Sequence, residues 1–447
     1  MLAFVSTIIL IFKRPSFRIP FTSKRLQIDY GSAPLLCALA LLATPSLPAL
    51  TLLREGIFGC SYIRPYSVVI LILSLSYICI SLDCTGFFKY ISLYIVKVAG
   101  SSGMRLFIYL FLLTSFLTMF TSNDVVILTI TYIVLYICTY AGVDPIPYLL
   151  AQFFAANILS MGLYVGNPTN IVIADAFGIT FIEFARWMLL PAVLASLTCL
   201  TLLILIFKRR IPRRIKIPNI NPQDSLEDRG GAIFGLLMLG GMLFLISLPT
   251  EWTDAQPWII ALSTALIMVS YDLLFRSSRT GMVIRSMPWK IAPFLIGLLI
   301  IIETLSFSGW TNFLATQISY SLSREPVISI FGLSFISALG AGLMNNHTMT
   351  VFFVKTIKES LALQFSERDQ IVSTFALVIG SNLGANYMLT GSLAGLMWSK
   401  ILSDKGVEIS FSKFSKYGFM IMPVVMLATS LSLTVMLMLN LSNGILL

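Results

Sequence analysis

Two short polar stretches interrupt long apolar segments of the chain. Residues 166–170 read GNPTN, and residues 380–386 read GSNLGAN. A membrane-embedded segment tolerates such a break only where its backbone lines a cavity or packs against protein. Glycine also allows the backbone to unwind, so that carbonyl groups and helix N-termini can point at a ligand. The two stretches therefore predict broken helices beside a buried polar site.

The composition around these stretches is that of a membrane protein. Of the 447 residues, 57% are hydrophobic and only 11% are charged, whereas an average soluble domain is about 25% charged. At roughly 20 apolar residues per span, the chain can form at most about a dozen membrane helices. We therefore expect an all-α polytopic membrane protein with about 10–12 transmembrane segments in a lipid bilayer. A water-soluble enzyme is excluded.

The placement of the net charge of +10 predicts the orientation of the chain. Basic residues form short runs between apolar segments, at 13–25, 208–216 and 276–290. Such runs are typical of cytoplasmic loops under the positive-inside rule. The loop that holds Glu251 and Asp254 has no basic residue, so we expect it on the outer face. No soluble basic module that could read a DNA groove is present, and we expect no nucleic-acid partner.

The apolar windows and basic runs divide the chain into five parts. The first window, residues 1–12, is too short to span and is followed by basic residues, which favours a membrane anchor over a cleaved signal peptide. The window at 31–53 is expected to cross the membrane once. The five parts are an N-terminal anchor and first span (1–65), a first transport repeat (66–207), a basic cytoplasmic linker (208–230), a connecting helix pair (231–290) and a second transport repeat (291–440).

The two halves share landmarks at matching distances. Gly86 precedes Asn123 by 37 residues, and Gly309 precedes Asn346 by the same 37 residues. The loop charges place residues 84–102 inside and their counterpart in the second half outside. Equivalent segments on opposite faces predict an inverted-topology repeat with broken helices. Secondary transporters with this architecture bind their solutes between the repeats, near the bilayer midplane.

Asp124 is the strongest single candidate for function. A charged Asp at the centre of a membrane helix costs about 2.5–3.5 kcal/mol, so intramembrane acids are functional candidates by default. Asp124 could carry a proton or bind a cation; the alternative is a cap at the start of the next helix. His347, the single histidine, occupies the corresponding position in the second half. Its ordinary pKa suits a proton carrier, although a lone histidine is more often a packing residue.

Neutral polar residues near the breaks form a candidate site for a small inorganic solute or ion. Amide and hydroxyl groups donate and accept hydrogen bonds without carrying charge. The alternative is hydrogen bonding between helices of a packed bundle. The candidate solute- or ion-binding residues are Asn123, Asp124, Asn167, Thr169, Asn170, Asn345, Asn346, Asn382, Asn386 and Ser392, and the candidate proton-coupling residues are Asp124 and His347.

Further charged residues lie near the ends of the predicted spans, where we expect them at the membrane surface rather than at a solute. Lys355 and Lys358 are expected to reach that surface with their long side chains. The acids of this group are Asp83, Asp175, Glu183 and Glu303.

The chain lacks the residues that common enzyme classes require. One histidine and six scattered cysteines provide no metal-ligand spacing, so we expect no metal site and no cofactor. No GxSxG-type serine motif and no phosphate-binding Walker loop are present. We therefore do not expect an enzyme, nor a chain that drives transport by hydrolysing ATP alone.

Several blocks resemble the arsenical pump membrane protein family (ArsB-type) of the ion transporter superfamily. The resemblance implies an inverted-repeat fold with re-entrant hairpins, and export of arsenite or antimonite coupled to proton entry. It also implies that the Asn123-Asp124 and Asn345-Asn346 pairs line the central site. Some members of the family pair with a separate ATPase subunit. The resemblance extends from Leu82 to Pro423, and its blocks are Ser122-Asn123-Asp124, residues 170–178 (NIVIADAFG), Met344-Asn345-Asn346 and residues 391–398 (GSLAGLMW).

These observations together predict a secondary active antiporter of the bacterial inner (cytoplasmic) membrane that works by alternating access. Protons or sodium ions would drive it, and an ATPase subunit or a second copy of the chain, as a homodimer, are the protein partners to test. The GNPTN stretch is similar to the carboxylate and sodium-coupled branches of the superfamily. A Na⁺/H⁺ antiporter or an anion/carboxylate symporter is accordingly the alternative within transport. A membrane subunit or receptor that does not transport is the alternative from another class.

Overall fold

Helices make up almost all of the protein. The computed structural model describes residues 1–13, 15–18, 25–44, 48–59, 64–216, 221–248, 255–322, 326–361 and 366–442. Within these ranges the only strands are β1 (Ser16–Arg18) and β2 (Arg25–Gln27), which pair antiparallel. The predicted all-α class is confirmed.

Nine helical stretches of the described ranges are long and apolar enough to cross a membrane. Three shorter apolar helices lie at Leu2–Ile11, Ser32–Leu42 and Ile146–Gly162. Large apolar side chains such as Leu197 and Leu431 are more than half exposed, as expected for surfaces that contact lipid rather than water. The prediction of a polytopic membrane protein is therefore confirmed.

Residues 65–207 form a bundle with one marked discontinuity. Two short 3₁₀ segments, η1 (Ser160–Gly162) and η2 (Tyr164–Gly166), separate its fifth helix from its sixth. Pro191 lies inside the last helix of this half. The helices are α4 (Pro65–Asp83), α5 (Phe87–Ala99), α6 (Gly103–Phe120), α7 (Asn123–Ala141), α8 (Ile146–Leu159), α9 (Pro168–Phe177) and α10 (Phe181–Phe207).

Residues 291–442 have the same order of elements. A single 3₁₀ turn, η4 (Leu389–Gly391), separates the fifth helix from the sixth, and Pro423 lies inside the last helix. The shared order agrees with two related halves, and their inverted orientation stays a prediction. The helices are α15 (Ile291–Phe307), α16 (Trp310–Leu322), α17 (Pro326–Met344), α18 (Asn346–Leu361), α19 (Glu367–Gly384), α20 (Leu393–Asp404) and α21 (Phe411–Ser442).

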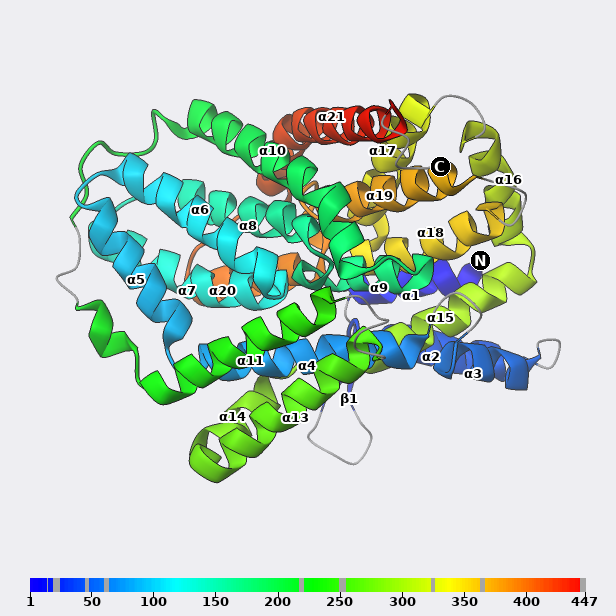
Figure 1. The fold of residues 1–447 in the computed structure, drawn as a ribbon, viewed down its shortest axis with the longest axis horizontal. Coiled ribbons are helices and arrows are strands. Elements are labelled where there is room, and N and C mark those ends of the chain that lie inside the picture. Colours follow the sequence, from blue (N-terminus) through cyan, green and yellow to red (C-terminus); the bar gives the residue numbers. More distant parts are fainter. Residues whose placement is uncertain are drawn as a thin grey trace.

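The broken helices of both halves lie in the middle of the bundle (Figure 1). The two proline-containing helices, α10 and α21, pack against each other along one edge. Along the opposite edge, α4 packs against α11 (Arg229–Ser247) and α13 (Pro257–Phe275). Between these edges lie α8, α9, α19 and α20, so the polar stretches of the sequence meet inside the molecule.

The segments before and between the two halves pack on the bundle. The basic linker contains the short turn η3 (Pro222–Ser225) and leads to α11, and α14 (Ser277–Ser286) follows α13. The expected outer loop with Glu251 and Asp254 lies outside the described residues. At the N-terminus, α1 (Leu2–Lys13) packs against α2 (Ser32–Leu42).

The window at 31–53 forms two helices instead of one. The first, α2, ends at Leu42, and α3 (Ala49–Ile57) begins directly after Pro48. Proline lacks the N–H that a helix requires and restricts the residue before it, and the sequence places prolines at both Pro45 and Pro48. The expected single crossing is therefore divided between two short helices.

The GSNLGAN stretch differs in one respect from the expected break. Helix α19 continues through it to Gly384. A Cβ at Gly380 would lie 1.8 Å from Ser337 Oγ, and one at Gly384 would lie 2.6 Å from the Ala338 carbonyl oxygen. The glycines of this stretch allow α19 to approach α17 closely, as small residues do in membrane bundles, and the chain leaves the helix only after Gly384.

A buried ion network fixes α4 to the helices that connect the halves. The Arg276 guanidinium contacts Asp228 and Asp272, with 2.7 Å between charged atoms in each pair. Asp272 also accepts hydrogen bonds from the hydroxyls of Ser81, at 2.6 Å, and Tyr77, at 3.0 Å. Removing one partner of such a network would leave a buried charge uncompensated, so these helices are expected to move together.

Candidate functional site

The GNPTN stretch forms the start of a half-helix. The chain turns sharply at Gly166, where a Cβ would lie 2.5 Å from the Ser160 carbonyl oxygen. Asn167 then caps α9, because its side-chain oxygen accepts a hydrogen bond from the Thr169 N–H at 3.1 Å. Pro168 occupies the first helical position, where its missing N–H costs nothing. Glycine, asparagine and proline thus place the N-terminus of α9 inside the bundle.

The polar stretches of the two halves meet at Asn382, whose side chain is fully buried. Its amide nitrogen donates to the Asn170 side-chain oxygen at 2.7 Å. Its side-chain oxygen accepts from Asn167 Nδ2 at 2.8 Å and from the Ser160 hydroxyl at 3.1 Å. More than 200 residues of sequence separate these partners, so the contact ties α9 to α19 directly.

A second chain of amides lies beside the first. Asn123 Nδ2 donates to the Asn157 side-chain oxygen at 2.9 Å, and Asn157 Nδ2 donates to the Asn386 side-chain oxygen at 3.0 Å. All three side chains are buried. Within the described part of the protein, the two outer atoms of this amide chain, Asn123 Oδ1 and Asn386 Nδ2, have no hydrogen-bond partner. Buried polar groups are almost always paired, so these atoms are candidates for contact with a solute.

We call these side chains the amide network. It contains donors and acceptors but no charged group. Thr169 belongs at its margin, with its hydroxyl 3.5 Å from that of Ser381. The members of the amide network are Asn123, Asn157, Ser160, Asn167, Thr169, Asn170, Ser381, Asn382 and Asn386.

Asn345, Asn346 and His347 form a separate cluster between α17 and α18. Asn345 adopts φ of 75° and accepts the His347 N–H with its side chain at 3.2 Å. His347 Nδ1 lies 2.9 Å from Asn346 Oδ1, and its other ring nitrogen, Nε2, is buried and has no partner in the described ranges. The ring also contacts Phe294 edge-on. No hydrogen bond between described residues joins this cluster to the amide network.

Asp124 and Ser392 have different surroundings. Asp124 lies in the first turn of α7, directly after Asn123, and is partly exposed. Among the described residues, its carboxylate has neither an ion-pair nor a hydrogen-bond partner. Ser392 caps α20, because its hydroxyl oxygen accepts a hydrogen bond from the Gly395 N–H at 3.0 Å. The hydroxyl therefore has a local structural role at the start of this helix.

Two of the charged residues expected at the membrane surface lie inside the protein. Lys355 is 8% exposed, and its ammonium group contacts both Glu303 oxygens, at 3.0 and 2.9 Å. The expectation that Lys355 reaches the surface is therefore wrong: a buried partner of opposite charge compensates its burial. Lys358 instead lies over the Phe177 ring, 4.6 Å from its centre. Asp83 accepts a hydrogen bond from the Thr129 hydroxyl at 3.0 Å.

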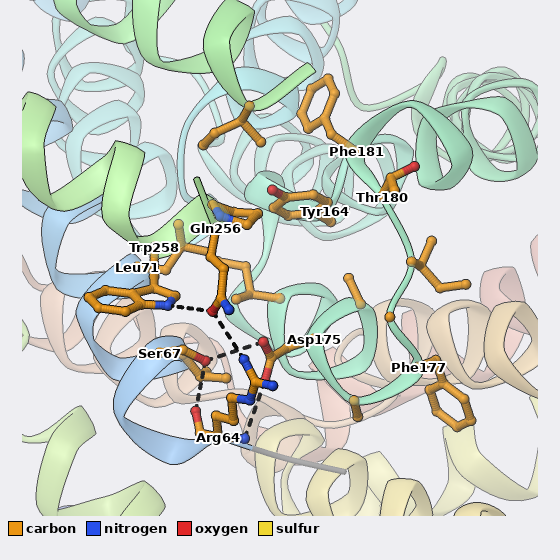
Figure 2. A pocket seen from close by; sticks show the side chains of 18 of the residues that line it. Arg64, Ser67, Leu71, Tyr164, Asp175, Phe177, Thr180, Phe181, Gln256 and Trp258 are labelled. Atoms are coloured by element: carbon orange, nitrogen blue, oxygen red, sulfur yellow. Dashed lines mark hydrogen bonds between the residues drawn. The ribbon is translucent and has the colours of Figure 1, made fainter. Parts of the chain in front are cut away.

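A cavity of about 750 Å³ lies between the C-terminus of α9 and the N-termini of α4, α10 and α13 (Figure 2). We call it the α9 cavity. Asp175 lies in its wall and accepts hydrogen bonds from the Arg64 N–H at 3.3 Å and the Ser67 hydroxyl at 3.2 Å. Tyr164 of η2 also lines the cavity.

Sequence reasoning missed three members of the amide network. Asn157 and Ser160 follow the apolar run of α8, and Ser381 stands directly beside Asn382. The position of Ser381 within GSNLGAN is a signal that could have found it. Nothing in the sequence next to Asn157 marks it, because it lies in the last turn of the apolar helix α8 with an apolar neighbour on each side.

Comparisons with known families and proteins give a consistent result. A family model described as "Arsenical pump membrane protein" matches residues 24–437. Arsenical pump membrane proteins of Escherichia coli and of Yersinia enterocolitica are each 29% identical to this chain over 354 residues, covering 77% of it and 80% of theirs. A transporter of Mycobacterium tuberculosis described as uncharacterized is 26% identical over 364 residues, covering 80% and 83%.

Two solved transporters share the fold. The YdaH transporter of Alcanivorax borkumensis aligns with a TM-score of 0.56 and 16% identity, over 99% of this chain and 96% of that one. MtrF of Neisseria gonorrhoeae, whose structure is described as illuminating a class of antimetabolite efflux pumps, aligns with a TM-score of 0.58 and 10% identity, over 97% and 93%. At these identities the likeness concerns the fold alone.

Proposed function

Since this chain belongs to the arsenical pump membrane protein family, we propose that it exports arsenite or antimonite across the bacterial cytoplasmic membrane, as a secondary active transporter driven by proton entry. The membrane-transporter fold and the relatives described as arsenical pumps support this proposal. The identity of the solute, the identity of the coupling ion and the membrane in which the protein lies are all parts of this proposal.

The absence of charged groups from the amide network is the main observation that supports arsenite as the solute. At neutral pH, arsenite in water is arsenous acid, an uncharged molecule with three hydroxyl groups. Each hydroxyl can donate and accept a hydrogen bond. The unpaired atoms Asn123 Oδ1 and Asn386 Nδ2 offer one acceptor and one donor. No arginine or lysine belongs to the network to compensate an anion, which favours a neutral hydroxylated solute over a carboxylate.

The contact between halves supports alternating access. Asn382 of α19 bonds to Asn167 and Asn170 of α9, and both helices begin or end at a break in the chain. A solute that replaces these hydrogen bonds with its own could allow the two halves to separate without leaving buried groups unpaired. The common element order of the halves is consistent with the inverted repeat that this mechanism uses.

Asp124 is the proposed coupling residue. It follows Asn123 of the amide network directly, and no cation among the described residues pairs with it. Protonation would discharge it when the site faces one side of the membrane, and release of that proton would restore the charge on the other. His347 is proposed only as a secondary titratable group, because it lies in the separate cluster.

No catalytic role is proposed for the chain. The partners that we propose are the solute, the coupling ion and the lipid bilayer. Association with an ATPase subunit is to be tested by co-purification. Formation of a homodimer is to be tested by measuring the mass of the purified protein in detergent.

The deciding experiment is expression in an arsenite-sensitive bacterial host, combined with arsenite uptake into everted membrane vesicles. We expect tolerance to rise, and uptake to require an imposed proton gradient. Sodium/proton exchange without arsenite uptake would favour the Na⁺/H⁺ antiporter, and carboxylate uptake would favour the symporter. Binding of a solute without flux of any of them would indicate a receptor or a subunit.

A further inference from the structure

The Tyr164 hydroxyl is the most informative polar group of the α9 cavity. Tyr164 is 3% exposed, and its hydroxyl has no hydrogen-bond partner among the described residues. Its ring packs edge-on against Phe181 and Phe184, with ring centres 5.4 and 6.1 Å away. This packing holds the side chain in the cavity wall, where Figure 2 shows it among the lining side chains. A buried hydroxyl that is fixed in place and unpaired indicates a missing partner.

Gln256 provides a second oriented group in the same cavity. Its side-chain oxygen accepts hydrogen bonds from Arg64 Nη1 at 3.1 Å and from Trp258 Nε1 at 2.8 Å. Figure 2 shows both contacts. With the oxygen held by two donors, the amide nitrogen Nε2 carries two N–H groups that no other described residue uses. An oxygen-rich ligand would find these donors already in position.

The α9 cavity also connects to the amide network through the chain. Tyr164 belongs to η2, which ends at Gly166 and is followed by Asn167 of the network. The other end of α9 carries Asp175 in the cavity wall. The half-helix α9 therefore has its N-terminus at the network and its C-terminus at the cavity.

We propose that the α9 cavity is a second solute site, which binds a small neutral hydroxylated solute through the Tyr164 hydroxyl and the Gln256 amide. The proposal rests on the proposed function, because it assigns the same class of solute to a second position on the route. The loop charges predict that this end of α4 faces the outside. The solute would therefore occupy the cavity after it leaves the amide network and before it is released.

Two conservative variants test the site without disturbing the packing around it. Tyr164→Phe keeps the ring between Phe181 and Phe184 and removes only the hydroxyl. Gln256→Glu keeps an oxygen for Arg64 and Trp258 and removes the two free donors. The matched control is Tyr66→Phe. Tyr66 packs edge-on against Trp258 at the same end of the molecule, with ring centres 5.8 Å apart, but it does not line the cavity.

Transport is measured as uptake of radioactive arsenite into everted vesicles whose lumen, which is the outer face, contains increasing unlabelled arsenite. Loss of one hydrogen bond to the solute corresponds to about a three- to tenfold change in binding. We therefore expect each variant to raise the lumenal arsenite concentration that halves uptake by about three- to tenfold. The half-saturating concentration on the cytoplasmic face should be unchanged, and Tyr66→Phe should behave as wild type.

A second measurement separates this inference from the proposed function. Arsenite should raise the thermal unfolding temperature of the purified wild-type protein in detergent, and the rise should be smaller in Tyr164→Phe than in Tyr66→Phe. Arsenite transport in which neither variant changes lumenal inhibition or the thermal rise would overturn the second site and leave the function standing. A Tyr164-dependent thermal rise without arsenite transport would overturn the proposed function and leave the second site standing. The absence of a thermal rise in the wild-type protein would overturn the second site.

Discussion

Asn157 joins the two outer members of its amide chain, because it accepts from Asn123 and donates to Asn386. Sequence reasoning found both neighbours, since each stands next to a break or a charged residue. It could not find Asn157, because an isolated asparagine within an apolar helix has no local feature that distinguishes a site residue from an interhelical contact. Only the packing of α8 against α7 and α19 shows which groups it meets.

Replacing Asn157 with leucine should abolish arsenite uptake and lower stability. The change leaves Asn123 Nδ2 and Asn386 Oδ1 buried without partners, at about 1–3 kcal/mol for each unpaired group. Uptake into everted vesicles and thermal unfolding in detergent measure the two effects. A suitable control is Thr201→Val on α10, whose exposed hydroxyl bonds only to the Leu197 carbonyl of its own helix. Normal uptake by Asn157→Leu would remove the amide network from the transport route.

Asp124→Asn should separate binding from coupling. The substitution keeps the size of the side chain and removes its ionisable group, so we expect arsenite-driven proton movement to fall at least tenfold. Arsenite should still stabilise the protein, because the amide network is intact. Proton movement is measured with a pH-sensitive dye in the vesicles, and Asp144→Asn, an exposed acid paired with Arg210, is the control. Unchanged proton movement would exclude Asp124 as the coupling residue.

The half-helix α9 is the element whose start the sequence predicted best. Gly166, Asn167 and Pro168 mark its start, because each has a local conformational role that does not depend on the rest of the fold. The end of α19 was harder to predict. Its glycines serve the close approach of α17, and a contact between two helices is not visible in the sequence of one. The division of 31–53 into α2 and α3 had a local signal in Pro45 and Pro48, which the apolar pattern concealed.

Gly166→Ala should disrupt the break before α9. The added Cβ would lie 2.5 Å from the Ser160 carbonyl oxygen and 3.0 Å from that of Thr118, both backbone atoms. We expect little folded protein, or folded protein without arsenite uptake, as judged by size-exclusion chromatography and the vesicle assay. Gly240→Ala in α11 is the matched control, because a Cβ there meets nothing within 4 Å. Wild-type behaviour of Gly166→Ala would contradict the tight turn.

At the scale of the whole molecule, a small number of ionic contacts hold distant parts of the chain together. Asp29, before α2, contacts Lys290, immediately before α15 of the second half. Burial alone would raise the pKa of Asp29. Lys290, through a hydrogen bond and its positive charge, and the N–H groups of Ser32 and Gly31, through hydrogen bonds, together lower this pKa below 3.8. The overall class followed from composition, whereas this contact between distant parts of the chain depends on the three-dimensional arrangement.

Asp29→Asn should reduce stability in a pH-dependent way. Because folding lowers the pKa of this carboxyl, the ionised form stabilises the folded state, and that contribution is fully present above about pH 3.8. It is lost as the pH falls through the lower pKa of the folded protein. We expect Asp29→Asn to unfold at a lower temperature than wild type at pH 6, and the difference to shrink as the pH falls below 3.8. The exposed lysine limits the size of the effect.

The absence of charge from the amide network has a consequence for the evolution of such a protein. Amides keep the same pattern of donors and acceptors at every pH that a bacterium survives, so the choice of cargo would not vary with the acidity on either side. The energy source enters through a carboxylate outside that network. Substitutions around Asp124 could then exchange one driving ion for another while the cargo stays the same, and substitutions among the asparagines could change the cargo under an unchanged driving force.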